Sequence, residues 1–140
     1  MNENTAFLKS FINESSNTIS GLRKHLDKIQ KIGIVLSDSL IKGKKILSCG
    51  NGGSAADAQH FAAEMLVRFR SDNDRRPLPA LALTQDVSTL TACANDYCYE
   101  EIYSRLVMGL GDKDDVLLAI STSGNSKNIL RAIEEAKKKE

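Results

Sequence analysis

The feature that most constrains the fold is a pattern that occurs twice along the chain. An apolar run over residues 45–49 leads into Gly50-Asn51-Gly52-Gly53-Ser54, and a second run over residues 115–120 leads into Ser121-Thr122-Ser123-Gly124-Asn125-Ser126. A helical pattern follows each turn at once. Short apolar runs bounded by turn residues are typical of buried strands. Strands that alternate with helices predict a parallel sheet with helical crossovers, so the sequence indicates the α/β class.

The remaining residues of this α/β part, about 45–140, continue the alternation. Residues 71–77 predict a loop, 80–83 a third strand, 86–110 two short helices divided near Asn95-Asp96, and a last helix follows Ser126. With no linker or low-complexity segment, we expect residues 1–140 to form a single domain. Only three strands precede the end of the chain, where a doubly wound sheet usually continues, so we expect the C-terminal part of such a fold to be missing.

A long helical segment is expected over about residues 4–42. Its apolar residues recur alternately every three and four positions; they include Leu8, Ile12, Ile19, Leu22, Leu26, Ile29, Leu36 and Leu40. Residues 13–17 are poor helix formers, so we expect two helices or one helix with a break. Such a seam must pack either on the sheet of its own domain or against a second copy of the chain. Both alternatives stay open here, and the second predicts a homo-oligomer.

Charge and cysteine content exclude some classes of protein. The formal net charge is +1 with basic and acidic residues interspersed, so we expect neither nucleic acid nor a membrane as a partner. No apolar run approaches the roughly 18 residues that span a bilayer. The three cysteines have no zinc-knuckle spacing and are interpreted as reduced thiols, which favours a cytoplasmic protein.

The two polar turns have the chemistry of an anion site. A helix start offers unpaired backbone N–H groups and the positive end of its dipole, and serine and threonine hydroxyls add donors. Two such turns at the carboxyl ends of parallel strands favour a small molecule that carries a phosphate. The structural alternative is that both turns only cap helices. Ser54, followed by Asp57 three residues on, has the form of such an N-terminal cap.

His60 and Glu64 lie four residues apart on the first of these helices, and therefore on one face of it. The pair suits a divalent metal site or the combination of a base with an acid. On spacing alone, an exposed surface pair remains the other interpretation.

Three blocks together carry a resemblance to a known family. They are the run from Gly50 to Glu64, the pair Asn95-Asp96, and the run from Ser121 to Ser126. In this order and context the chain resembles the phosphoheptose isomerases of the sugar isomerase (SIS) domain family, including the long N-terminal helical segment. The resemblance implies a flavodoxin-like parallel sandwich.

The resemblance also implies an activity and a set of site residues. The activity is conversion of sedoheptulose 7-phosphate to D-glycero-D-manno-heptose 7-phosphate through an enediol, the entry step to the heptose of bacterial lipopolysaccharide. Glu64 would be the catalytic base, and His60 with Glu64 would hold zinc. The implied substrate-binding residues are Asn51, Gly52, Gly53, Ser54, Glu64, Asn95, Asp96, Ser121, Thr122, Ser123 and Ser126. A homotetramer is implied as the assembly.

The same resemblance leaves the ligand set incomplete. Family members continue into a C-terminal helix whose Gln and His complete the metal site, and these residues have no counterpart up to Glu140. We therefore expect weak metal binding and slow turnover from the chain as it stands. Two alternatives remain: a non-catalytic SIS regulator or a module that associates with a replication initiator, and a purely structural oligomer. The carboxylate of Glu64 favours the isomerase, and the serine-rich turn is unexplained by the structural oligomer.

Overall fold

The computed structural model describes residues 2–139. Contacts within the chain divide it into two units, one up to Val35 and one from Leu36 onward, and each is described by itself. Among the described residues, no helix is both long and apolar enough to cross a membrane.

The first unit is helical. It contains α1 (Glu3–Gly21), the 3-10 turn η1 (Leu22–His25) and the start of α2 (Leu26–Ile41). The expected break exists, but the prediction that residues 13–17 cause it was wrong, because these residues lie inside α1. Each weak helix former costs a helix only about 0.5 kcal/mol relative to alanine. In addition, the Thr18 hydroxyl donates to the Glu14 carbonyl within the helix. Instead, the backbone changes from an α-helix to the 3-10 turn directly after Gly21.

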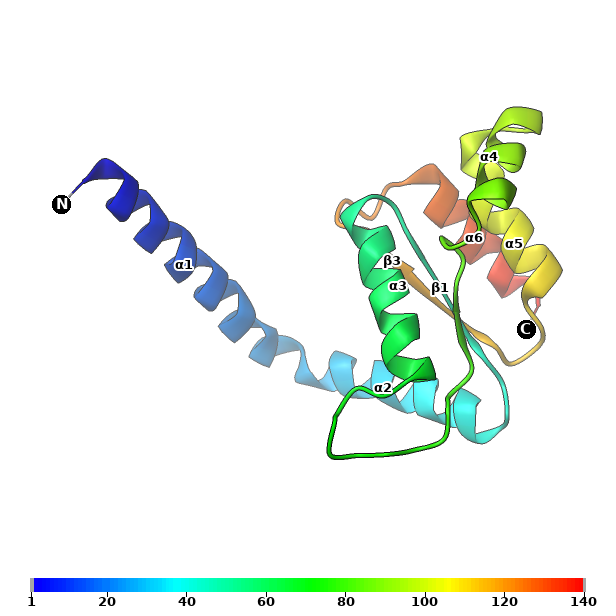
Figure 1. The fold of residues 1–140 in the computed structure, drawn as a ribbon, viewed down its shortest axis with the longest axis horizontal. Helices are drawn as coiled ribbons and strands as arrows, with labels where there is room; N and C mark the ends of the chain where they lie inside the picture. Colours follow the sequence, from blue (N-terminus) through cyan, green and yellow to red (C-terminus); the bar gives the residue numbers. More distant parts are fainter. Residues whose placement is uncertain (1, 140) are drawn as a thin grey trace. The chain divides into compact units, whose positions relative to one another are not determined.

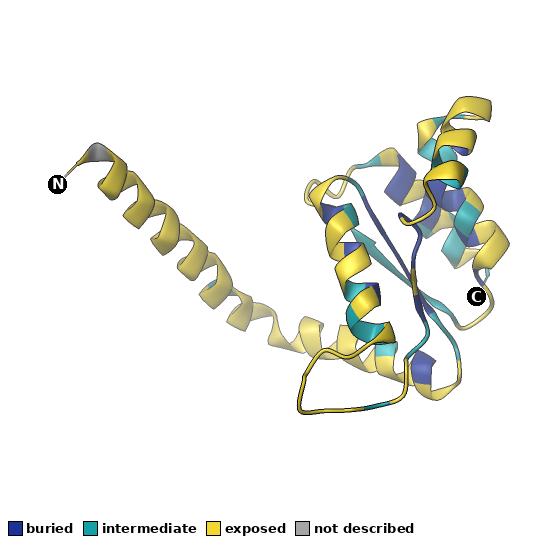
Figure 2. Ribbon diagram, viewed as in Figure 1, coloured by how far each residue is buried: buried dark blue, intermediate teal, exposed yellow. Residues whose placement is uncertain are grey.

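Large apolar residues are exposed along this unit, and the ribbon of α1 is yellow, the colour of exposed residues, in Figure 2. They are Phe7, Leu8, Phe11, Ile12, Ile19, Leu22, Leu26, Ile29, Ile32, Ile34 and Val35. We call this set the N-terminal apolar stripe. The seam's last two positions, Leu36 and Leu40, belong to the second unit and pack with Ile46 and Ala62.

The second unit is a three-stranded parallel sheet with helices on both faces (Figure 1). The strands are β1 (Ile46–Gly50), β2 (Ala80–Ala82) and β3 (Val116–Ile120), and the helices are α3 (Gly53–Leu66), α4 (Val87–Asp96), α5 (Ile102–Leu110) and α6 (Lys127–Lys137), with a 3-10 turn η2 (Tyr99–Glu101). The strand order β2-β1-β3 places β1 at the centre. These elements confirm the expected α/β class, the loop over 71–77 and the pair of helices divided after Asp96.

Alternate residues of the strands face the two layers. Leu47 and Cys49 of β1 join Ile102 and Val107 of α5 in one core cluster. Ile46 faces the other way, into a cluster with Ala62 of α3. Every residue of β1 is buried, including Ser48, whose hydroxyl donates to the Ala58 carbonyl, so the central strand is covered on both faces. The sheet thus holds α3 on one face and α5 and α6 on the other.

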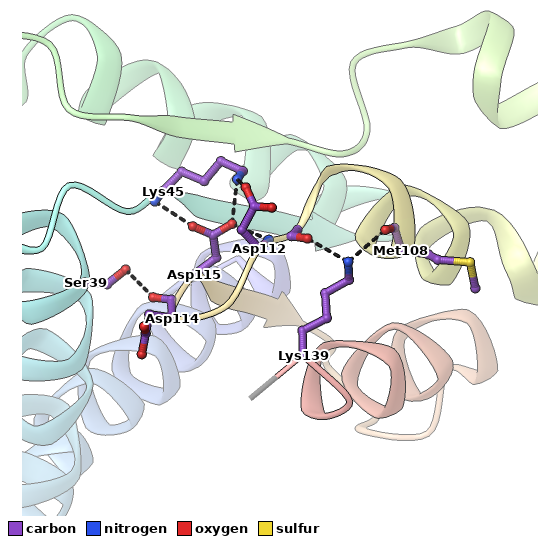
Figure 3. Close-up of polar contacts among 8 residues, drawn as sticks. Ser39, Lys45, Met108, Asp112, Asp114, Asp115 and Lys139 are labelled. Carbon is purple, nitrogen blue, oxygen red and sulfur yellow. Dashed lines mark hydrogen bonds and ion pairs between the residues drawn. The ribbon is translucent and has the colours of Figure 1, made fainter.

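A cluster of polar contacts links the elements at the end of the sheet where β1 and β3 begin (Figure 3). The buried carboxylate of Asp115 pairs with the Lys45 ammonium at 2.6 Å and accepts the Lys45 and Asp112 backbone N–H groups at 3.0 and 2.8 Å. Lys139 donates to the carbonyls of Met108 and Gly111 at the end of α5. These contacts lie at the amino ends of the strands, opposite the two polar turns.

Candidate functional site

The structure brings the two polar turns together. β1 and β3 pair in parallel from Ile46 with Val116 to Gly50 with Ile120, so both strands end at the same edge. The residues that follow them, Asn51 and Ser121, therefore start neighbouring turns. Because ligands of open α/β sheets bind outside the carboxyl ends of the strands, this edge is the candidate site.

Two glycines allow the backbone of the first turn to adopt its conformation. A Cβ atom on Gly50 would lie 2.3 Å from the backbone oxygen of Ser54, so the strand end and the start of α3 approach too closely for any side chain. Gly52, with φ 55° and ψ −121°, is the N-cap of α3. The predicted cap by Ser54 and Asp57 was wrong, since the helix begins at Gly53 and Ser54 is already its second residue.

The amide of Asn51 is held by two residues that the sequence analysis missed. Asn51 Nδ2 donates to Asn128 Oδ1 at 2.9 Å, and Asn128 Nδ2 donates back to Asn51 Oδ1 at 2.8 Å. The Tyr99 hydroxyl donates to the same Oδ1 at 3.0 Å. The Tyr103 hydroxyl donates to the neighbouring Gly50 carbonyl. The four-residue spacing of Tyr99 and Tyr103 is thus one sequence signal for this arrangement. Burial, together with Tyr99 and Cys49 nearby, raises the pKa of Tyr103 to about 12, so it remains a donor.

The serine-rich turn is held by its own hydroxyls. Ser121 Oγ accepts the Gly124 N–H at 3.1 Å and lies 3.4 Å from Ser126 Oγ, while Ser123 Oγ accepts the Asn125 N–H at 3.2 Å. Because these hydroxyl oxygens are the acceptors in the two bonds to backbone N–H groups, the proton of Ser123 remains available to donate to an anion, as does that of Ser121 when Ser126 is the donor in their contact. Thr122 and Ser123 are exposed in this turn.

Asn95 and Asp96 lie at the end of α4 and are exposed, with Asn95 Nδ2 donating to Asp96 Oδ1 at 2.9 Å. Tyr99, three residues beyond Asp96, reaches Asn51 of the first turn. The segment that carries this pair is therefore tied to the first turn through Tyr99.

His60 and Glu64 make the contact that their spacing predicts. His60 Nε2 lies 3.4 Å from Glu64 Oε1, with the histidine side chain 77% exposed and the glutamate side chain 28% exposed. The second oxygen, Glu64 Oε2, is buried and has no hydrogen-bond partner among the described residues. An unpaired buried carboxylate oxygen is costly unless a ligand, ion or water binds it, so this atom is a candidate binding position.

A groove surrounds this pair. Its lining combines Asp57, His60 and Glu64 of α3 with the apolar side chains Phe61, Met65, Phe69 and Leu78, and with Arg75 of the loop that follows. Asp57, three residues before His60 on α3, also lines the groove. Arg75 donates to the Glu64 and Met65 carbonyls at 2.6 and 2.8 Å. Arg75 was missed by sequence reasoning because a polar loop arginine carries no local signal of a partner ten residues away.

One copy of the chain does not place Glu64 beside the serine-rich turn. α3 starts next to the turns at Gly53 and reaches Glu64 three helical turns later. A rise of about 1.5 Å per residue puts the two residues roughly 16 Å apart along the helix axis. The described residues also contain no group of three or more His, Cys, Asp or Glu side chains that could hold a metal. His60 and Glu64 are thus two potential ligands without a third.

The buried thiol of Cys49, directly before the first turn, is not a reactive group. Burial raises its pKa to about 12, so it stays a neutral thiol at neutral pH. It contributes to the core of the sheet instead.

Comparison with known proteins gives a consistent result. Residues 10–140 match the family model of the SIS domain. The chain is 60% identical over 111 residues to a phosphoheptose isomerase of Coxiella burnetii, covering 79% of this chain and 55% of that protein. It is 50% identical over 127 residues to a phosphoheptose isomerase of Shewanella loihica, covering 91% and 64%.

Solved structures agree with the fold. A phosphoheptose isomerase from Neisseria gonorrhoeae superposes with a TM-score of 0.88 at 40% identity, covering 96% of this chain and 70% of that chain. One from Francisella tularensis gives 0.85 at 37% identity, covering 99% and 71%. The chain spans little more than half the length of the first of these curated relatives, so the relatives are longer, as the sequence analysis expected.

Proposed function

Since the chain belongs to the SIS domain family, within its phosphoheptose isomerase branch, we propose that it serves the isomerisation of sedoheptulose 7-phosphate to D-glycero-D-manno-heptose 7-phosphate. The observation that supports this most directly is the placement of the donor-rich serine turn beside the glycine turn at the carboxyl edge of the sheet. The reaction would supply the heptose of bacterial lipopolysaccharide. We also propose a cytoplasmic location, since the pattern of three cysteines is that of reduced thiols.

Glu64 is the proposed base. It would take the proton from carbon 1 of the ketose, whose C–H electron pair then forms the carbon 1–carbon 2 double bond while the carbonyl electrons move to oxygen 2. The proton on oxygen 1 then moves to oxygen 2, and the proton held by Glu64 returns to carbon 2 as the oxygen 1 electrons form the carbon 1 carbonyl, which gives the aldose. A carboxylate within hydrogen-bond reach suits this step, and the unpartnered Oε2 is the proposed acceptor of the proton.

The serine-rich turn is the proposed phosphate site. Ser121, Ser123 and Ser126 would donate hydroxyl protons to the phosphate, with Thr122 lining the turn, and the start of α6 adds the positive end of its dipole. Asn51, Gly52, Gly53, Ser54, Asn95 and Asp96 would contact the sugar. For Asn51, the bonds to Asn128 and Tyr99 leave one Nδ2 hydrogen for that contact.

Zinc is the proposed metal, and His60 Nε2 with a Glu64 oxygen fits two of its ligand positions. The 3.4 Å separation of His60 Nε2 and Glu64 Oε1 suits a shared cation, which leaves Oε2 as the proposed proton acceptor. When bound, zinc would act as a Lewis acid that stabilises negative charge on the substrate oxygens. The other ligands would have to come from groups beyond those described, because no third candidate lies with this pair in residues 2–139.

A homo-oligomer, a tetramer by family resemblance, is the proposed assembly. The exposed N-terminal apolar stripe supports it, since large apolar side chains exposed in a row along a helix usually mediate association. The axial separation of roughly 16 Å between Gly53 and Glu64 supports it as well, because a second copy can bring its own carboxylate to the turn of the first. Equimolar mixing of Glu64→Gln and Ser123→Ala chains should then restore part of the activity that each variant lacks.

The alternative is a non-catalytic SIS domain that binds a sugar phosphate, and the two-ligand set favours it. The deciding experiment is NMR of sedoheptulose 7-phosphate with the chain in deuterated buffer, with and without zinc. Aldose product with deuterium at carbon 2, absent with Glu64→Gln, supports the isomerase. Binding without exchange supports the non-catalytic alternative, and exchange retained in Glu64→Gln contradicts the assigned base.

A further inference from the structure

The side chain of Asn51 is already committed to contacts within the protein. Its Oδ1 accepts from both Asn128 Nδ2 and the Tyr99 hydroxyl, and its Nδ2 donates to Asn128 Oδ1. An amide oxygen has two acceptor sites and an amide nitrogen two hydrogens. Both sites on the oxygen and one of the two hydrogens are therefore used, so Asn51 has one orientation before any ligand arrives.

Asn128 fixes that orientation from the side of the serine-rich turn. It is only 2% exposed, and its Oδ1 also accepts the Ile129 backbone N–H at 3.0 Å, which prevents the amide from rotating. It stands at the second position of α6, directly after the serine-rich turn. The reciprocal amide pair thus joins two turns that are 77 residues apart in the sequence.

Tyr99 fixes Asn51 from the opposite side. Its ring is 56% exposed, and its hydroxyl reaches Asn51, while Tyr103, one helical turn further, donates to the Gly50 carbonyl from a buried position. The segment leading into α5 therefore holds both the last residue of β1 and the first residue of the turn.

We propose that Asn128 and Tyr99 are positioning residues that align the glycine turn with the serine-rich turn through the amide of Asn51. A sugar phosphate that bridges the turns depends on this alignment, whereas inorganic phosphate, which needs only the serine-rich turn, does not. The choice of sugar phosphate as probe rests on the proposed function.

Tyr99→Phe tests the proposal with little effect on folding, because it removes one hydroxyl from an exposed ring and leaves α6 intact. Affinity for sedoheptulose 7-phosphate should fall about 2- to 12-fold, the change expected for one lost hydrogen bond. Affinity for inorganic phosphate should stay unchanged, and the side-chain amide resonances of Asn51 and Asn128 should shift in ¹⁵N NMR spectra. Tyr97→Phe is the matched control, since the Tyr97 ring packs 4.0 Å from the Arg105 guanidinium, a contact that phenylalanine keeps.

A second variant addresses Asn128. Asn128→Asp retains an acceptor for the Ile129 N–H but cannot donate to Asn51, so the Asn51 side-chain resonances should shift here too. Unshifted Asn51 resonances in both variants would overturn the proposal, and so would unchanged sugar-phosphate affinity in Tyr99→Phe. If the wild-type chain binds no sugar phosphate, the proposed function fails, and the resonances alone decide the positioning role.

Discussion

The buried carboxylate of Asp115 should be the most sensitive polar group at the base of the sheet, and Asp115→Asn tests this. The substitution keeps one oxygen for the Lys45 backbone N–H at 3.0 Å. The new amide NH2 takes the place of Oδ2, which faces the Asp112 N–H at 2.8 Å and the Lys45 ammonium at 2.6 Å. Two bonds to a charged acceptor are thereby replaced by donors that face donors.

The magnitude follows from those two bonds. Each hydrogen bond to a charged group contributes about 1.5 kcal/mol or more, so the loss is at least about 3 kcal/mol before relaxation. Lys45 recovers part of it, because its side chain is 29% exposed and keeps Asp112 at 2.8 Å. We expect a net loss of about 2 kcal/mol in the free energy of unfolding. Asp112→Asn is the matched control and should change it far less, since that side chain is 74% exposed.

The effect should depend on pH in a defined direction. Burial alone would raise the pKa of Asp115, but the Lys45 side chain and the Lys45 and Asp112 N–H groups outweigh it and hold the pKa below its ordinary value of 3.8. A lowered carboxyl pKa stabilises the fold above the unfolded-state pKa, and this contribution disappears as pH falls through the folded-state pKa. Urea unfolding at about pH 7 and about pH 3 should therefore show the difference between wild type and Asp115→Asn shrinking in acid. An equal difference at both pH values, or equal effects of the Asp112 and Asp115 variants, would refute the reasoning.

Three further changes test the site and its frame. Ser123→Ala should weaken sugar-phosphate binding by about 0.5 to 3 kcal/mol in calorimetry, the range from an ordinary hydrogen bond to one with a charged group; unchanged affinity would mean that the turn only caps a helix. Gly50→Ala should lower the free energy of unfolding by about 1 to 3 kcal/mol in chemical denaturation, because its methyl group would lie 2.3 Å from a backbone carbonyl oxygen of α3. Gly53→Ala is the control and should be tolerated, since a methyl group there has no atom within 4 Å. Arg75→Gln should lower stability by about 1 to 2 kcal/mol through two lost carbonyl bonds, and hydrogen exchange should rise at the end of α3, while the exposed Arg76→Gln should leave both unchanged.

Local patterns were sufficient to predict most of the fold. Apolar runs before Gly50 and Ser121 predicted β1 and β3 to within a residue, because a short apolar run bounded by a turn has few other stable environments. The same patterns placed both polar turns at the carboxyl ends of parallel strands. Family resemblance added the site residues, which remain predictions.

Contacts between distant residues could not be predicted in the same way. Asn128 and Asn51 are separated by 77 residues, and an asparagine inside a helix resembles any surface polar residue in sequence. Helix ends were missed for a related reason. Ser54 has the residue type of a cap, but its backbone lies close to Gly50 and the helix already begins at Gly53. Tertiary contacts thus decided between local alternatives that the sequence left nearly equal.

The contacts that hold α3 in place limit how the groups of the proposed reaction can come together. Its start is set by the close approach of Gly50 to Ser54, its middle by the Ser48 hydroxyl, which donates to the Ala58 carbonyl at 3.0 Å, and its end by Arg75. A helix held at three points keeps Glu64 at a constant distance from the turns, roughly 16 Å along the axis. Local motion within one copy therefore does not carry the carboxylate to the serine-rich turn. For Glu64 to act on a sugar whose phosphate is bound there, we expect the two groups to come from different copies, so the proposed activity depends on the proposed oligomer.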